Sequence, residues 1–214
     1  MNEWQDRWQE GRIGFHLPEY NKQLLKYWPE LEVKENSSVF VPLCGKTLDL
    51  VWLRQQGNKV TGSELIEMAV KAFFNEQGFD PEVKQQGELS YWSYSGLSLI
   101  QGDFFAIPDY SIDASVFYDR AALIALPESM RKQYVEKLLQ AAPAIEKGLL
   151  ITVEYEQSQM SGPPFSVSES EVRSLYSNRF DIKLLARERT DLSPKMKAAG
   201  LTGMSEVVYQ LVRK

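Results

Sequence analysis

The sequence predicts an α/β fold with a doubly wound, mostly parallel sheet, and two patterns support this prediction. Apolar runs of strand length alternate with amphipathic segments of helix length over most of the chain, as they do where crossover helices join parallel strands. The last two strand-like runs, 180–187 and 205–212, have no long helix between them, so we expect an antiparallel end to the sheet. With 214 residues, 43% of them hydrophobic, the chain has the size of one domain with one core.

In the first half of the chain the sequence predicts four strands and two helices. The run 38–42 (SVFVP) ends at a proline, which cannot donate to a sheet ladder and therefore marks the end of a strand. Gly57 and Gly78 follow the two amphipathic segments as helix stops, and Ser95-Gly96 is the turn of a hairpin arm. The strands are predicted over 38–42, 59–64, 89–94 and 97–101, and the helices over 48–56 and 66–77.

In the second half of the chain the sequence again predicts four strands and two helices. The run 148–155 (GLLITVEY) is almost wholly apolar, as a strand buried on both faces is. Ser168 and Glu171 have the spacing of a capping box at the start of a helix. The strands are predicted over 112–118, 148–155, 180–187 and 205–212, and the helices over 128–141 and 168–176.

Composition and charge disfavour several classes of function. A net charge of -5 leaves no positive field of the kind that binding to phosphate backbones requires, so we expect no nucleic-acid partner. The single cysteine, Cys44, excludes an internal disulfide, and the first ten residues are polar rather than a signal sequence. No apolar run approaches the ~20 residues of a membrane span. We expect a soluble, cytoplasmic protein without membrane contact.

The loop after the first predicted strand, 42–49 (PLCGKTLD), lacks the glycines that a phosphate-binding loop needs. Its Gly-Lys-Thr ending is that of a P-loop, but that motif requires a glycine at position 40, where Phe40 stands. A dinucleotide fingerprint needs several glycines for close approach of a pyrophosphate, and this loop has one. A ligand bound here is therefore expected to lack phosphates, which disfavours a nucleotide-dependent oxidoreductase.

Glu64 closes the second predicted strand, about 20 residues after Gly45, which is the distance at which an acid meets ribose hydroxyls in dinucleotide folds. A ribose without pyrophosphate is what an adenosyl ligand such as S-adenosylmethionine offers. The alternative is a solvated acid at a strand end, and the spacing does not decide between the two.

Two further strand ends carry candidate groups. After 97–101, Asp103 and Phe104 offer an acid and an aromatic face for an adenine amino group and ring; the alternative is a turn with core phenylalanines. Arg120, after the next predicted strand, is a fixed cation that can meet an anionic sulfur or a carboxylate; the alternative is a surface salt bridge with Asp119. We expect no histidine or perturbed acid near Arg120 to act as a base, so its predicted role is electrostatic.

Cys44 and His16 are the single cysteine and the single histidine. Cys44 has no histidine partner within reach along the sequence, so we expect it to pack as a small hydrophobic residue rather than to act as a nucleophile. One histidine and one cysteine fall short of a metal site, and no metal is predicted.

Short motifs occur in order along the whole chain. They are WxxxW at 4–8 with IGFH at 13–16, VPLCGK at 41–46 with DLxWL at 49–53, GxE at 62–64, GDFF at 102–105, YDRAAL at 118–123 and GPPF at 162–165. Together they resemble the bacterial thiopurine S-methyltransferase family. The resemblance implies a class I methyltransferase (Rossmann-like) fold: a seven-stranded, mostly parallel sheet with one antiparallel strand. It also implies one methyltransferase domain, with an N-terminal helical cap or lid over 1–36 and an α/β core over 37–214.

The resemblance also implies the cofactor and the site residues. The cofactor would be S-adenosyl-L-methionine, with S-adenosyl-L-homocysteine as its product. The residues implied to bind it are Trp8, Phe15, Leu43, Glu64, Asp103, Phe104 and Arg120. Those implied to bind the methyl acceptor are Phe15, Arg120 and Lys195, with Arg120 as the catalytic residue; Lys195 stands near the place of a second active-site arginine in the animal enzymes. The alternative for Trp8, which shares a helix face with Trp4, is a core anchor.

The implied activity is methyl transfer to the sulfur of a small-molecule aromatic or heterocyclic thiol, by a monomer. Detoxification of selenium or tellurium compounds, and with it tellurite resistance, is a further activity that the resemblance suggests. A non-catalytic protein that binds an adenosyl ligand or another metabolite on the same fold stays open as the alternative.

Overall fold

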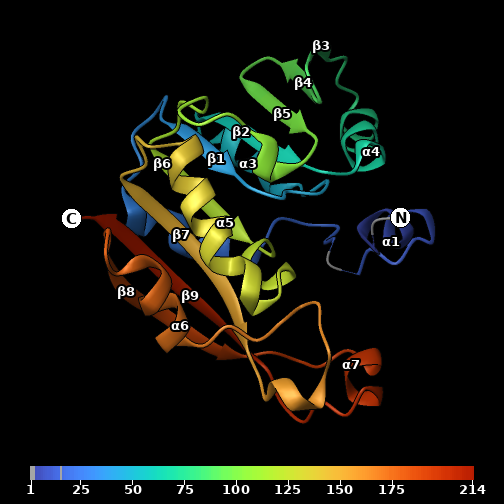
Figure 1. Cartoon of the computed structure of the whole chain (residues 1–214), viewed down its shortest axis with the longest axis vertical. Coiled ribbons are helices and arrows are strands. Elements are labelled where there is room, and N and C mark those ends of the chain that lie inside the picture. Colours follow the sequence, from blue (N-terminus) through green and yellow to red (C-terminus); the bar gives the residue numbers. More distant parts are fainter. Residues whose placement is uncertain (1–2, 15) are drawn as a thin grey trace.

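The structure, a computed structural model, describes residues 3–14 and 16–214, except for the side chains of residues 3 and 195. A mixed sheet of nine strands runs through the described part of the chain (Figure 1). The strands are β1 (Ser38–Val41), β2 (Lys59–Glu64), β3 (Glu82–Gln86), β4 (Leu89–Tyr94), β5 (Leu97–Gln101), β6 (Val116–Arg120), β7 (Lys147–Glu154), β8 (Phe180–Arg189) and β9 (Ser205–Arg213). The α-helices are α1 (Glu3–Gln9), α2 (Lys22–Tyr27), α3 (Asp49–Gln55), α4 (Glu67–Gln77), α5 (Glu128–Ala141), α6 (Glu169–Tyr176) and α7 (Pro194–Ala198). Short 3-10 helices are η1 (Trp28–Leu31), η2 (Phe104–Ala106), η3 (Leu123–Ala125) and η4 (Gln157–Gln159).

The strand order is β3-β4-β5-β2-β1-β6-β7-β9-β8. From β5 to β7 neighbouring strands pair in parallel, whereas β9 is antiparallel to both β7 and β8. Among the strands from β5 to β8, β9 is therefore the one that runs in reverse. The predicted α/β fold, with a mostly parallel sheet and an antiparallel end, is confirmed.

The expected count of seven strands is too low for the described residues, because β3 and β4 extend the sheet beyond β5. The predicted hairpin arm is β4 and β5, and β5 also pairs in parallel with β2, so it belongs to the main sheet. β3 escaped prediction because all its residues are exposed and its sequence, EVKQQ, has no apolar alternation.

Two hydrophobic cores cover the two faces of the sheet. Successive strand residues point to opposite faces, so Val39 and Val41 join the core formed with α2, α3 and α4, while Phe40 joins the core formed with α5 and α6. Figure 1 shows α5 lying across the front of the sheet. This is the two-sided packing that the doubly wound prediction requires.

Several boundaries differ from the predicted ones for local reasons. β6 begins at Val116 rather than at 112, because the N–H of Ile112 donates to the carbonyl of Ala141 at the end of α5 (3.0 Å) instead of to a strand. The predicted cap of α6 is present, with the N–H of Glu171 donating to Ser168 Oγ at 3.2 Å. The helices α2 and α7, with six and five residues, are too short to show a helical period in the sequence. None of the described helices combines the length and the apolar character that a bilayer-spanning helix needs.

Gly62, in β2, is required by the packing beneath the loop after β1. A Cβ at this position would lie 2.5 Å from Leu99 Cδ2 and 2.8 Å from Cys44 Sγ. We expect Gly62→Ala to lower the free energy of unfolding by ~1–3 kcal/mol, because buried neighbours must shift to make room. Urea denaturation measures this change. Gly14→Ala is the control, since a Cβ there meets nothing within 4 Å; equal stability of the two variants would contradict the packing argument.

Candidate functional site

The loop after β1 is held against the end of β2 by hydrogen bonds that its backbone N–H groups donate to Ser63. The N–H of Leu43 donates to Ser63 Oγ (3.1 Å), and the N–H of Cys44 donates to the carbonyl of Ser63 (2.8 Å). Leu43 and Gly45 have positive φ values of 46° and 57°, so the loop turns tightly where it meets β2. Leu43, a predicted cofactor contact, is thereby placed next to the end of β2. Ser63 was missed by sequence reasoning because a serine inside a strand carries no distinctive signal.

Glu64 is a buried acid that joins this loop to the next helix. Its Oε2 accepts the N–H of Gly45 (2.8 Å) and its Oε1 accepts the N–H of Ile66 (2.7 Å). Burial raises the pKa of Glu64 to about 7, although these backbone hydrogen bonds lower it. The alternative of a solvated acid at a strand end is therefore wrong. Each carboxylate oxygen has a second lone pair, so Glu64 keeps the capacity to accept ribose hydroxyls.

The segment after β5 places Asp103 and Phe104 differently. Asp103 is exposed, and its Oδ1 accepts the N–H of Phe105 (2.9 Å), which caps η2. Phe104 is 3% exposed and its ring centroid lies 5.1 Å from that of Tyr134 in the main core. The ring of Phe104 therefore packs as a core phenylalanine, as the alternative expected. The contact of Asp103 and Phe104 with adenine stays a prediction.

Arg120 is the last residue of β6, and the backbone turns sharply directly after it. Ala121, next to it, has a φ of 66°. Asp119 is fully buried and accepts the hydroxyl of Tyr134 (2.7 Å) and the N–H of Leu123 (3.1 Å), while burial raises the pKa of Asp119 to about 6. Asp119 is thus a buried anchor of the turn that carries Arg120, and the alternative of a surface salt bridge between the two is wrong.

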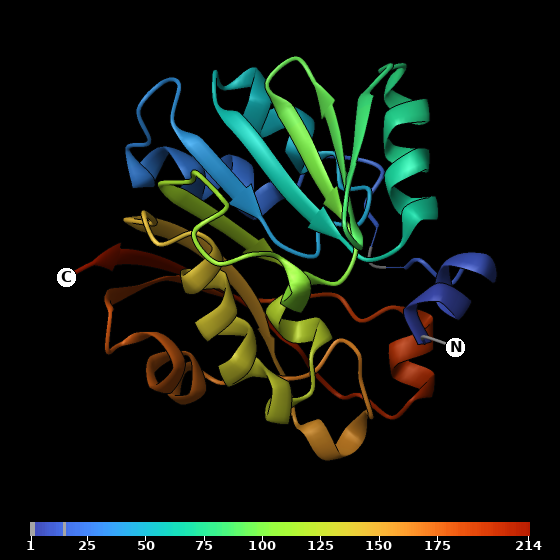
Figure 2. The same ribbon diagram turned by 45° about the horizontal axis from the view of Figure 1, so that its top comes forward.

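The N-terminal segment is anchored at two points near these strand ends. Trp8 is buried in a small cluster with Ile66 and Ala69 at the start of α4. It therefore serves as a packing anchor, and Ile66 follows Glu64 by two residues in the sequence. Farther on, Asp49 accepts the N–H of Asn21 (2.8 Å) through Oδ1. Figure 2 shows α1 standing apart from the sheet, on the side toward which the arrowheads of β1 and β2 point. Whether Trp8 also contacts the cofactor stays a prediction.

His16 lies in this segment. The expectation that neither a histidine nor a perturbed acid stands near Arg120 is therefore wrong on both counts, since Asp119, next to Arg120, has a raised pKa. The charges that act on the ring of His16 include those of Lys46, from the loop after β1, and Arg120. Burial first, and then Lys46, lower the pKa of His16. Two signals pointed to it: it is the single histidine of the chain and it belongs to the IGFH motif. Spacing did not reveal that the two are close enough to interact electrostatically, because more than a hundred residues separate His16 from Arg120.

The remaining predicted residues are placed less completely. Phe15 lies outside the described residues. Lys195 lies in α7, which packs through Met196 into a small cluster with Ile124, shortly after Arg120 in the chain; the role of Lys195 stays a prediction. Cys44 is buried and burial raises the pKa of its thiol, in agreement with a packing role. Within 3–14 and 16–214, no three His, Cys, Asp or Glu side chains gather as metal ligands.

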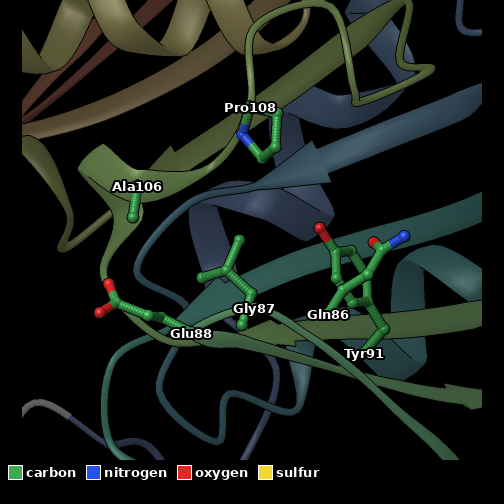
Figure 3. A pocket seen from close by; sticks show the side chains of 7 residues that line it. Gln86, Gly87, Glu88, Tyr91, Ala106 and Pro108 are labelled. Carbon is green, nitrogen blue, oxygen red and sulfur yellow. The ribbon is translucent and has the colours of Figure 1, made fainter.

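A surface hollow of about 370 Å³ lies between the turn joining β3 to β4 and the segment after η2 (Figure 3). It is lined by Gln86, Gly87, Glu88, Leu89, Tyr91, Ala106 and Pro108. None of these is a predicted site residue. The candidate site is instead the convergence of Leu43, Glu64, Arg120 and the N-terminal segment at the carboxyl ends of the parallel strands, where open α/β sheets bind their ligands.

Comparison with known sequences gives one family over the whole chain. The family model described as thiopurine S-methyltransferase (TPMT) matches residues 1–214. Thiopurine S-methyltransferase of Pseudomonas syringae pathovar tomato is 43% identical over 213 residues, covering 99% of this chain and 97% of that protein. The protein of the same description from Nitrosomonas eutropha is 46% identical over 214 residues, covering 98% and 96%.

Two solved structures with a similar fold are described as methyltransferases. A Burkholderia thailandensis methyltransferase, solved with 1,6-didemethyltoxoflavin and S-adenosylhomocysteine bound, has a TM-score of 0.63 at 13% identity and covers 99% of this chain and 86% of its own. A TehB-like SAM-dependent methyltransferase from Corynebacterium glutamicum has a TM-score of 0.59 at 11% identity, with 99% and 96% covered. At these identities the similarity shows a shared fold.

The raised pKa of Glu64 predicts how stability changes with pH. Its value rises from an ordinary 4.5 to about 7 on folding, so the unfolded chain loses this proton first and the free energy of unfolding falls as the pH rises from about 4.5 to about 7. Glu64→Gln stays neutral, and we expect a flatter dependence over this range in urea denaturation of the ligand-free protein. Glu136→Gln, on the exposed side of α5, is the control; the same profile for both variants would contradict the raised pKa.

Proposed function

Because the chain belongs to the thiopurine S-methyltransferase family, we propose that it methylates the sulfur atom of aromatic or heterocyclic thiols. It is an S-adenosylmethionine-dependent methyltransferase, and S-adenosylmethionine is its methyl donor. The match over residues 1–214 carries the proposal for the acceptor. A protein that only binds an adenosyl ligand is not supported, since the relatives over this whole length carry the name of an enzyme.

The donor set at the strand ends fits an adenosyl ligand with an amino-acid tail. Glu64 is a buried acid whose oxygens are already oriented by two N–H groups, which suits vicinal ribose hydroxyls. Asp103 is an exposed acid suited to an adenine amino group, and Arg120 is a cation suited to a carboxylate. Leu43 and Trp8 would border the ligand, and Phe15 is proposed with them from the family resemblance. Bound there, S-adenosylmethionine supplies an electrophilic methyl group on a sulfonium sulfur.

The protein's own residues then have two tasks, orientation and exclusion of water. Holding the acceptor sulfur in line at near-attack distance can supply ~7–11 kcal/mol of the barrier. Arg120, fixed by the buried turn at Asp119, would orient the acceptor sulfur and stabilise its negative charge. The N-terminal segment, with Phe15 and Trp8, and the loop 162–165 would close the site. Acidic heterocyclic thiols are ionised near neutral pH, so for them no proton has to be removed.

Further parts of the proposal follow from the sequence. We propose selenium and tellurium compounds as additional acceptors, with tellurite resistance as the consequence, and Lys195 as a second cation for the acceptor. We also propose a cytoplasmic monomer of one domain, with residues 1–36 as the cap on the core 37–214, that acts on small molecules and not on nucleic acid.

A methyl-transfer assay with labelled S-adenosylmethionine tests the proposed activity. The panel contains heterocyclic thiols, simple aromatic thiols, an alkyl thiol, a selenol and tellurite. We expect turnover of the heterocyclic and aromatic thiols, because the proposed site offers a cation and apolar walls to them. Calorimetry with S-adenosylhomocysteine is measured in parallel. Tight binding of S-adenosylhomocysteine without turnover of any thiol would contradict the proposal.

Substitution of Arg120 tests its electrostatic role. Arg120→Ala removes a preorganised donor, so we expect kcat/KM for a heterocyclic thiol to fall ~10²–10³-fold. Arg120→Lys keeps the charge but loses the planar fork, and its kcat/KM should lie between those of the wild type and Arg120→Ala. Arg179→Ala, at an exposed position, is the control. An Arg120→Ala variant with wild-type kcat/KM would remove Arg120 from the site.

A further inference from the structure

His16 stands where four parts of the chain bring charges together. It lies between α1 and α2, with its backbone N–H donating to the carbonyl of Ile13 (2.9 Å). The charges that act on its ring come from Lys46 in the loop after β1, Asp49 at the start of α3, Glu76 in α4 and Arg120 at the end of β6. Ile13, which accepts this hydrogen bond, packs against Ile66 and Ala69 just after the end of β2, so His16 lies close to the strand ends of the proposed site.

One ring nitrogen of His16 lacks a hydrogen-bond partner within the described residues. Nδ1 is shielded from solvent and makes no hydrogen bond to any described group. A shielded polar atom without a partner costs stability. A bound molecule that presents a proton to Nδ1 would remove this cost, and the acceptor is the molecule that Arg120 would hold nearby.

Burial and two nearby cations lower the pKa of the imidazole, which favours its neutral form. Burial lowers the pKa of His16, Lys46 and Arg120 act in the same direction, and Glu76 and Asp49 oppose them. The opposition is limited, because Glu76 is paired with Lys46 at 2.6 Å and Asp49 is occupied by other hydrogen bonds. A neutral imidazole has one nitrogen lone pair free to accept a proton.

We propose that His16 is a catalytic base that takes the proton from methyl acceptors still protonated at neutral pH; this rests on the proposed function. In this step the S–H bond of the thiol breaks and its proton goes to Nδ1. The electron pair left on the thiol sulfur forms the new S–CH₃ bond. The bond between the methyl group and the donor sulfonium breaks, and its electron pair stays on the donor sulfur. The positive charge passes from the sulfonium to the imidazolium, which loses its proton to water after the product leaves.

This role divides the acceptors by acidity. A thiol that is ionised at the assay pH has no proton to give, so His16 contributes nothing to its methylation beyond packing. A less acidic thiol of similar shape has to be deprotonated, and general-base catalysis typically contributes ~10²–10⁴-fold. His16 therefore widens the range of thiols that the enzyme can methylate.

Two aromatic thiols of similar shape, one ionised and one protonated at the assay pH, test the proposal in the wild type and in His16→Gln. We expect His16→Gln to lower kcat/KM for the protonated thiol by ~10²-fold or more and to leave kcat/KM for the ionised thiol near the wild-type value. Equal losses with both thiols, or no loss with either, would overturn the base role alone. Absence of turnover with any thiol in the wild type would overturn the proposed function and the base role with it.

A titration of the ring by NMR gives a readout that does not depend on activity. His16 is the single histidine, so its imidazole signals need no assignment. In the ligand-free wild type we expect a pKa below the ordinary value of histidine, and Lys46→Gln and Arg120→Gln should each raise it by removing a nearby cation. Lys34→Gln, at an exposed position, is the control and should leave it unchanged. A pKa that responds to neither Lys46→Gln nor Arg120→Gln would overturn the proposed placement of the base.

Discussion

The carboxylate of Glu64 connects the segments that form the site, and the geometry of the strand ends depends on it. Its two oxygens accept the N–H groups of Gly45 and Ile66, and its carbonyl accepts the N–H of Gly102. The loops after β1, β2 and β5 are therefore oriented by one residue. Burial of the carboxyl group disfavours its charge, and the two hydrogen bonds offset part of this cost. An acid held in this way needs little rearrangement to meet the hydroxyls of a ribose.

A second buried acid links the N-terminal segment to the sheet. Asp49 accepts the N–H of Asn21 through one oxygen and the hydroxyl of Tyr118, in β6, through the other. Trp8 forms a separate contact with the start of α4. The N-terminal segment is thus tied to the start of α3 and to the start of α4, the two helices that follow β1 and β2. The same anchors that stabilise the fold therefore bring the N-terminal motifs to the site.

The fold could be predicted where burial imposed a pattern. β7 is a buried strand in a nearly continuous apolar run, and α5 follows an apolar period over fourteen residues, so both were predictable. β3 has only exposed residues, and its pairing with β4 comes from backbone hydrogen bonds that any sequence can make. The count of strands therefore exceeded the prediction. The helices α2 and α7 have too few residues to show a helical period in the sequence. Short helices of this kind depend on packing against the rest of the molecule.

The sequence by itself determined the fold class, the loops that end the parallel strands, the family and the methyl donor. The periodicity of apolar residues indicates which side chains are buried, and the order of the motifs indicates the family. Neither depends on which loops, far apart in the sequence, lie next to each other in the fold. Only the tertiary structure decided that the ring of Phe104 lies in the core, that Asp119 anchors a turn, and that His16 stands near Arg120. The physical reason is that these contacts join residues far apart in the chain, and which of them come together is set by the pairing of strands and the packing of helices on the sheet.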